Sequence, residues 1–122
     1  MNTLGLIAAV TAFLSIWGGH VAVRKIEFLS RTIWLPTLVF VMLGVTADLL
    51  SLFMINRPLS MVLGILGITF FFDAFESTRQ QKRVKKGHAP ANPNNPRHAF
   101  FLAQSNSHAT TENLLKREPR KI

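Results

Sequence analysis

The chain has 122 residues, a formal net charge of +8 and no cysteine. This length allows one domain at most, and the lack of cysteine excludes disulfide frameworks, thiolate metal sites and cysteine nucleophiles. Only four of the fourteen Lys and Arg precede Glu76, so an apolar front half is followed by a basic back half. The front half holds uncharged runs of about 20 residues, the length that a helix needs to cross a hydrocarbon core. The sequence therefore predicts an all-α, three-span transmembrane protein.

The first predicted span covers residues 3–23 and is followed directly by Arg24 and Lys25. A signal peptide is the alternative, but no Lys or Arg precedes the apolar run and no secreted domain follows it, so a retained helix is favoured. Small residues recur in this span at steps of three and four, which places them on one helix face that permits close packing. They are Gly5, Ala8, Ala12, Ser15 and Gly19.

The second and third predicted spans cover residues 33–55 and 58–75, separated by an Asn-Arg-Pro turn. Pro36 falls in the first turn of its helix and Pro58 at a first helical position, where the missing amide proton costs little. Small residues again offer packing faces, either within one bundle, between copies of the chain, or against a larger membrane complex. They are Gly44 and Ala47 in the second span, and Ser60, Gly64 and Gly67 in the third.

The positive charges predict the orientation, because short loops rich in Lys and Arg stay in the cytoplasm. Three spans place the first loop, residues 24–32, and the C-terminal tail on the same side. That side carries every Lys and Arg except Arg57. We therefore expect a multi-pass protein of the cytoplasmic membrane with its N-terminus outside and its C-terminus in the cytoplasm.

Two polar residues, Asp48 and His20, are predicted to lie inside the membrane. An unpaired carboxylate there costs at least ~2.5 kcal/mol, so Asp48 is either a protonated acid bonded to a neighbouring helix or the acid of an ion pathway. Haem proteins of membranes usually offer two histidines at matching depth, and His20 has no such counterpart. Pairing of His20 with a carboxylate such as Glu27 or Asp73 is the favoured interpretation.

The third helix is predicted to continue through a basic segment, residues 76–87, and to end at Gly87. Asp73 is interpreted as a boundary residue neutralised by Lys25 or Arg79. Cations beside a membrane attract anionic headgroups, at about 1 kcal/mol per charge. Those predicted to contact headgroups or a partner are Arg79, Lys82, Lys85 and Lys86.

Residues 1–87 thus form the predicted transmembrane region, and residues 88–122 a basic, Pro/Asn-rich and largely irregular tail. Residues 89–98 hold three prolines and three asparagines and are predicted to be an extended linker. Phe100 and Phe101 are too apolar for an unattached tail, so we predict that they contact the membrane interface or a partner. Beyond about His98 we expect disorder, or order that depends on a partner.

The segments GGHVAVRKIEF, LGILGITFFFDAFE and QQKRVKKGHAPANP resemble a family of small bacterial membrane proteins known only as domain of unknown function number 4491. In that family an acid at the end of the third span precedes a basic RVxKG segment and a PxNP turn. The family usually has aromatic residues where this chain has His88 and Ala89. The resemblance implies no reaction, but it implies an interfacial polar cluster around the first loop and the exit of the third span. With His20 nearby, its members would be Lys25, Glu27, Asp73, Glu76 and Arg83.

No motif for catalysis, a cofactor or a metal is present: the sequence has no glycine-rich phosphate loop, HExxH or GxSxG. We expect a non-enzymatic accessory or structural subunit that packs against a larger membrane complex or self-associates, with lipids as further partners and no role for nucleic acid. The alternative is a small oligomeric transporter or channel that uses Asp48. A cofactor-bearing electron-transfer subunit using His20 is a weaker third hypothesis.

Overall fold

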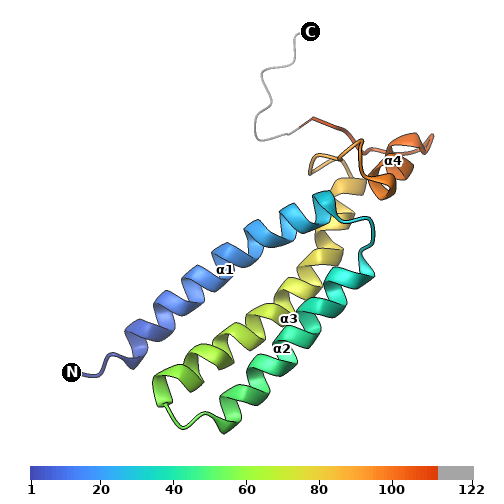
Figure 1. Cartoon of the computed structure of the whole chain (residues 1–122). Helices are drawn as coiled ribbons and strands as arrows, with labels where there is room; N and C mark the ends of the chain where they lie inside the picture. The colour runs from blue at the N-terminus through green and yellow to red at the C-terminus, as the bar shows by residue number, and fades with distance from the viewer. Residues whose placement is uncertain (113–122) are drawn as a thin grey trace.

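The computed structural model describes residues 1–112, which form four helices and no strand. The helices are α1 (Leu4–Leu29), α2 (Trp34–Phe53), α3 (Arg57–Lys85) and α4 (Pro96–Ala103) (Figure 1). The predicted all-α fold class is therefore confirmed. By length and composition, α1, α2 and α3 are each long and apolar enough to cross a membrane.

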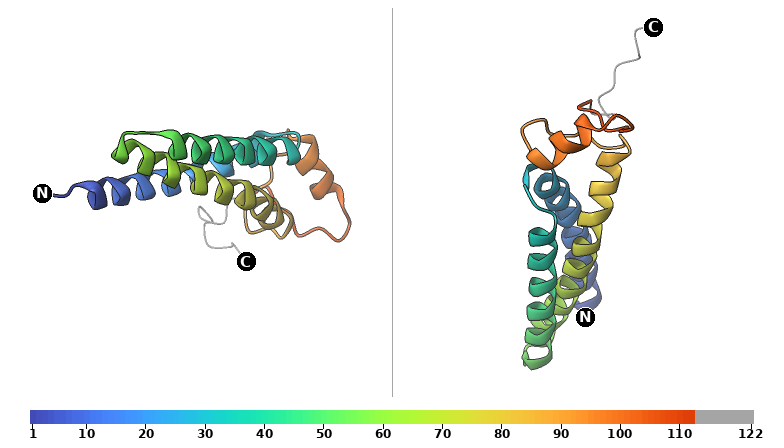
Figure 2. Two further views of the ribbon diagram at one scale, coloured as in Figure 1. Left: turned by 90° about the horizontal axis from the view of Figure 1, so that it is seen from below. Right: turned by 90° about the vertical axis from the view of Figure 1, so that its right-hand side faces the viewer.

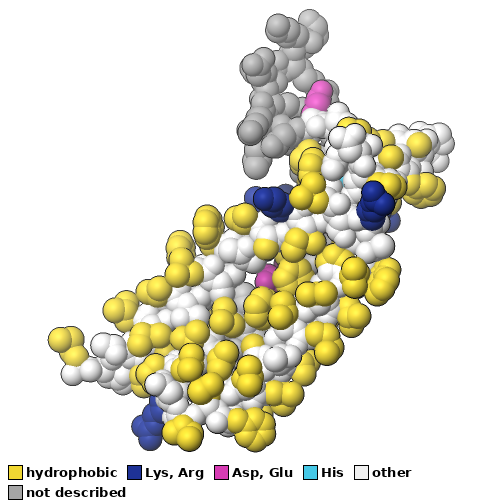
Figure 3. Space-filling model, in the orientation of Figure 1, with side chains coloured by type: hydrophobic (Ala, Val, Ile, Leu, Met, Phe, Trp, Pro, Cys, Tyr) yellow, Lys and Arg dark blue, Asp and Glu magenta, His cyan; other side chains and the backbone are white. Residues whose placement is uncertain are grey.

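The central element of the bundle is α3. Both α1 and α2 pack along it, and they make little contact with each other. The three long helices run side by side, and α4 lies beyond one end of the bundle (Figures 1 and 2). Hydrophobic side chains cover the long helices on the face shown in Figure 3, while Lys and Arg gather toward their ends.

Both ends of α3 follow local signals in the sequence. The Asn56 side chain accepts a hydrogen bond from the Leu59 amide at 3.0 Å, and a proline occupies the first turn. The helix then runs without a break into the basic segment, as predicted. It ends at Lys85, and Gly87, just after the C-cap residue Lys86, has a φ of +79°, a conformation that favours glycine. The amides of Gly87 and His88 donate to the carbonyls of Val84 and Arg83, which is the Schellman pattern.

Helix α1 is longer than predicted. The segment RKIEFL, assigned above to the first loop, is helical as far as Leu29, so only residues 30–33 connect α1 to α2. Nothing in this segment breaks a helix, since it contains neither proline nor glycine. The extension carries Glu27 away from the apolar part of the bundle and toward the tail.

The predicted irregular linker is confirmed for residues 88–95, but the prediction is wrong for residues 96–103, which form a helix. Helix α4 begins at Pro96, and the Asn95 side chain accepts from the Arg97 amide at 3.1 Å, so Asn95 is its N-cap. Beyond α4 the chain is again irregular, and it turns back so that the Ala91 amide donates to the Thr110 carbonyl at 2.8 Å. The remainder of the predicted tail, residues 113–122, lies outside the described residues.

Glycines set how closely the long helices approach one another. A Cβ at Gly44 of α2 would lie 3.0 Å from the Gly67 carbonyl oxygen of α3. A Cβ at Gly67 would overlap the Asp48 carboxyl group, and Gly64 faces the Ser51 hydroxyl. The small residues of α2 and α3 therefore form a close seam between these two helices.

The small-residue face of α1 is used only in part. Gly19 is buried against α3, and the Ser15 and Thr69 hydroxyls are hydrogen-bonded at 3.2 Å. Ala8 and Ala12 are half-buried. Gly5 is exposed, and a Cβ there would meet no atom within 4 Å. The N-terminal end of this face thus lacks a packing partner within residues 1–112.

Candidate functional site

The most extensive polar network joins the C-terminal end of α1 to α4. Its centre is Glu27, whose side chain is 1% exposed. One carboxylate oxygen, Oε1, lies 2.6 Å from Arg97 Nη1 and 2.8 Å from His98 Nε2. The carboxylate is thus buried together with a guanidinium group that balances its charge, which is the condition for burying an ion pair.

The hydrogen bonds of His98 define its tautomer. The Asn92 amide donates to His98 Nδ1 at 2.9 Å, so Nδ1 carries no proton. The proton therefore resides on Nε2, which donates to Glu27. The ring is completely buried, stacks on Phe101 and meets Phe28 edge-on. His98 acts here as a neutral imidazole that positions a carboxylate.

Side chains of the tail also bind the last carbonyl groups of α1, which have no partner inside the helix. Arg97 Nη2 donates to the Glu27 carbonyl at 2.5 Å. The side-chain amides of Asn92 and Asn95 both donate to the Phe28 carbonyl at 3.1 Å. We call this set the tail clamp, comprising Glu27, Asn92, Asn95, Arg97 and His98.

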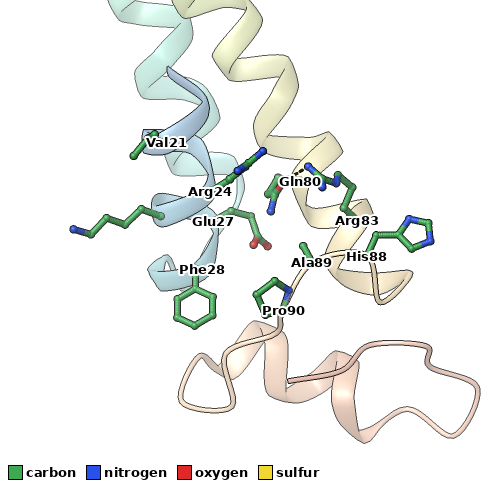
Figure 4. A pocket seen from close by; sticks show the side chains of 10 residues that line it. Val21, Arg24, Glu27, Phe28, Gln80, Arg83, His88, Ala89 and Pro90 are labelled. Atoms are coloured by element: carbon green, nitrogen blue, oxygen red, sulfur yellow. Dashed lines mark hydrogen bonds between the residues drawn. The ribbon is translucent and has the colours of Figure 1, made fainter. Parts of the chain in front are cut away.

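A pocket of about 440 Å³ adjoins the tail clamp, between α1, α3 and the segment that follows α3 (Figure 4). Arg24 and Lys25 line it from α1, and Arg83 from α3. None of these three cations forms an ion pair within residues 1–112. We call it the basic pocket, and it is lined by Val21, Arg24, Lys25, Glu27, Phe28, Gln80, Arg83, His88, Ala89 and Pro90.

The prediction that Lys25 or Arg79 neutralises Asp73 is wrong for residues 1–112. Asp73 is 7% exposed and packs against Gly19, where a Cβ would overlap its carboxylate. Within residues 1–112 the Asp73 carboxylate has no hydrogen bond or ion pair. Arg79 pairs with Glu76 at 3.0 Å instead. Tight packing at a glycine, which sequence spacing does not reveal, buries this acid.

The predicted interfacial polar cluster divides into two groups. Lys25, Glu27 and Arg83 line the basic pocket. Asp73 and Glu76 line a different pocket of about 350 Å³, together with His20, which is exposed and makes no hydrogen bond within residues 1–112. The two groups thus line two different pockets, so they do not form one site. No three His, Asp or Glu side chains of the described residues are arranged to hold a metal ion.

Asp48 lies in the seam between α2 and α3, half-buried against Gly67. One turn away, the Ser51 hydroxyl donates to the Ser60 carbonyl at 2.6 Å and the Ser60 hydroxyl to the Ser51 carbonyl at 2.7 Å. The Asp48 carboxylate itself accepts no hydrogen bond from residues 1–112. The seam therefore holds one satisfied polar pair and one unpartnered acid.

The residues predicted to contact headgroups or a partner differ in exposure. Arg79, Lys82, Lys85 and Lys86 are all exposed, and Lys85 Nζ lies 4.8 Å from the centre of the Phe101 ring. Phe100 is 64% exposed and remains available to lipid or a partner. Phe101 is not available, because its ring is buried within the chain in a small core. The other members of that core are Val84, Ala89 and Ala91.

Sequence reasoning overlooked Arg97, His98 and Asn95 as site residues. The Asn-Pro pair at residues 95–96 is a helix start signal that would have located α4. No local pattern indicates that Arg97 and His98 meet Glu27.

These features describe a small all-helical protein with three helices suited to crossing a membrane and a polar network that attaches the tail to the end of α1. The chain belongs to the family described as domain of unknown function 4491, whose model matches residues 2–95. The match contains Glu27 and Asn92 and ends at Asn95, directly before α4. Searches of curated proteins and of solved structures find no match.

Proposed function

We propose that the protein is a non-enzymatic accessory or structural subunit of the bacterial cytoplasmic membrane. It packs through α1 against a larger membrane complex or a second copy of itself. One observation carries this proposal: the buried residues of α1, which are Gly19, Val23 and Glu27, all lie in its C-terminal half. The N-terminal end of the helix, around Gly5, therefore lacks a packing partner within residues 1–112.

The exposed half of α1 has the composition of a helix-packing surface. Lipid gives apolar helices no hydrophobic drive to associate, so close contact relies on small residues that let two backbones approach. Gly5 and Ala8 lie on the same face of α1 as Ser15 and Gly19, which already pack on α3. A partner helix on this face would continue the same mode of packing toward the N-terminus.

The proposed orientation places the tail clamp in the cytoplasm. Arg24, Lys25 and the basic segment of α3 lie at the end of the bundle that carries α4 (Figure 1). Arg57 begins α3 at the opposite end. This asymmetry supports a cytoplasmic C-terminus and an external N-terminus. A C-terminal reporter enzyme that is active only outside the cytoplasm would contradict the orientation.

Enlarging the free part of the small-residue face tests the proposed packing. Gly5→Leu combined with Ala8→Leu should release the partner, because two leucines hold the helices apart. Val10→Phe is the control, since Val10 points away from this face and is exposed. The measurement is the mass of the species purified from native membranes in a mild detergent. Wild type and control should migrate as a complex and the double variant as a monomer.

A wild-type chain that purifies from native membranes as a monomer would contradict the proposal. Unchanged assembly of the Gly5→Leu/Ala8→Leu variant would show that another face binds the partner. Circular dichroism of each variant reports whether the chain itself stays folded.

The alternative function, a small oligomeric transporter or channel, is supported by Asp48. Its carboxylate lies in an apolar seam without a hydrogen bond from the described residues, as expected for an acid that exchanges an ion. Asp48→Asn should abolish ion flux into vesicles under this alternative, and should be tolerated if the protein is an accessory subunit. The electron-transfer hypothesis rests on His20 alone, and a visible absorption spectrum of the pure protein tests it.

A further inference from the structure

The basic pocket concentrates positive charge that the chain does not balance. Arg24 from α1 and Arg83 from α3 both line it, and Figure 4 shows the two side chains extending toward Gln80 between the helices. Lys25 adds a third cation. Like charges gathered in one pocket repel one another, so an anion bound among them would relieve that repulsion.

The one acid of the pocket does not supply this anion. Glu27 Oε1 lies 2.6 Å from Arg97 Nη1 and accepts a hydrogen bond from Nε2 of neutral His98, so the charge of Glu27 is already balanced inside the tail clamp. The remaining walls are the apolar groups of Val21, Phe28 and Pro90. The pocket thus has a net positive charge on a partly apolar surface.

Gln80 adds a hydrogen-bond donor to the basic pocket. Its side chain is buried, and Oε1 accepts from Arg83 at 3.2 Å. The amide nitrogen has no partner among the described residues and faces the pocket (Figure 4). A donor that opens onto the pocket beside two guanidinium groups is a suitable arrangement for phosphate oxygens, since guanidinium groups bind phosphate in a bidentate manner.

The position of the pocket indicates where such a phosphate comes from. It lies where α1 passes from its apolar run to Arg24, which is headgroup depth for a helix that crosses the membrane. Val21 lines the pocket and is 50% exposed, and Trp17, one turn earlier on the same face, is 62% exposed. An acyl chain attached to a bound phosphate therefore has an apolar track to follow along α1.

We propose that the basic pocket binds the phosphate of an anionic phospholipid headgroup. Arg24 and Arg83 contact the phosphate oxygens, Gln80 donates a hydrogen bond, and Lys25 adds charge at the rim. The site rests on the membrane placement of the proposed function but does not depend on α1 having a protein partner.

The test is native mass spectrometry of the full chain in detergent micelles. Dioleoyl phosphatidylglycerol and dioleoyl phosphatidylcholine are titrated separately, and inorganic phosphate is added as a soluble competitor. We expect one tightly retained phosphatidylglycerol, with phosphatidylcholine bound at least tenfold more weakly. Phosphate at millimolar concentration should not displace the lipid, because it lacks the acyl chains.

The variant for this test is Arg24→Gln combined with Arg83→Gln. Its affinity for phosphatidylglycerol should fall roughly 30-fold, which corresponds to two contacts of about 1 kcal/mol each. Arg31→Gln combined with Arg57→Gln removes the same charge outside the pocket and should change the affinity less than about threefold. Arg24 and Arg83 are exposed, so the helical content of the variant should match that of wild type.

Three outcomes would overturn the proposal. Equal retention of both lipids would show that the pocket does not select charge. An equal loss in the two double variants would indicate a diffuse charge effect. Displacement of the lipid by inorganic phosphate would identify free phosphate as the ligand. A chain that washes off membranes at high pH would instead refute the membrane placement of the proposed function.

Discussion

Two regions of the molecule bury carboxylates in opposite ways. In the tail clamp, Glu27 is bound by a guanidinium and an imidazole that come from about 70 residues further along the chain. In the helix seams, Asp73 and Asp48 pack against Gly19 and Gly67 and receive no hydrogen bond from the described residues. The clamp acid therefore stabilises the fold, whereas the seam acids impose a cost on it.

This difference shows that burial alone does not decide whether an acid stabilises or destabilises this fold. A buried carboxylate stabilises when its partners are buried with it and destabilises when they are missing. Substitutions of the clamp and seam acids should accordingly have opposite signs.

The largest expected effect comes from Glu27→Ala. It leaves Arg97 and His98 buried without their acceptor, so the free energy of unfolding should fall by about 3–5 kcal/mol. Thermal unfolding in micelles, followed by circular dichroism, measures this loss. Glu76→Gln is the control, because the pair with Arg79 is largely exposed and contributes less than about 1 kcal/mol. If the Glu27→Ala variant unfolds at the same temperature as wild type, the tail clamp does not stabilise the fold.

Phe101→Ala should have the next largest effect, about 3 kcal/mol, because it empties the small core between α4 and the end of α3. The loss should be local, so the measurement is amide hydrogen exchange across residues 96–103. Phe100→Ala provides a matched control, since that ring is 64% exposed. Equal exchange in the two variants would mean that α4 is not held by the Phe101 ring.

Asp73→Asn should raise stability, in contrast to the clamp variant. The amide keeps the shape of the side chain and removes a charge that receives no hydrogen bond within residues 1–112; leaving such a group unsatisfied costs about 1–3 kcal/mol. The midpoint of thermal unfolding in micelles should therefore rise. A fall would indicate that Asp73 is stabilised by a cation or water bound between α1 and α3.

Gly87→Ala should have the smallest of these effects, about 1–2 kcal/mol, from the cost of a side chain at positive φ. The added Cβ would also overlap the His108 carbonyl oxygen, so the returning segment should separate from the turn after α3. The Ala91 amide, which donates to Thr110, is the probe: its hydrogen exchange should accelerate. Unchanged protection would show that the segment stays in place despite the strain.

The parts of the fold that depend on local signals were predictable. Apolar runs indicated α1, α2 and α3, and Gly87 followed by Pro90 indicated the end of α3. The extension of α1 to Leu29 was missed because a change from apolar to charged residues was interpreted as the end of the helix. Helix α4 was missed because the prolines around Asn95 were all interpreted as breakers, although one of them starts a helix.

The parts of the site that depend on tertiary contacts were not predictable. Glu27, Arg83 and Lys25 were singled out, but neither Arg97 nor His98 carries a local sign of its partner. The burial of Asp73 depends on which face of α1 meets α3, and that is set by Gly19 and Ser15 together with Thr69. The spacing of small residues in the sequence identifies which face of a helix packs, but not which residue of the neighbouring helix that face contacts.

The tail clamp also sets an order of events during synthesis. Ribosomes add residues from the N-terminus onward, so Glu27 emerges 70 residues before Arg97. Helices α1 and α2 likewise emerge before α3, the helix against which both of them pack. The clamp is therefore the last of these contacts of α1 for which both partners become available, and it can form only after all three long helices have been made.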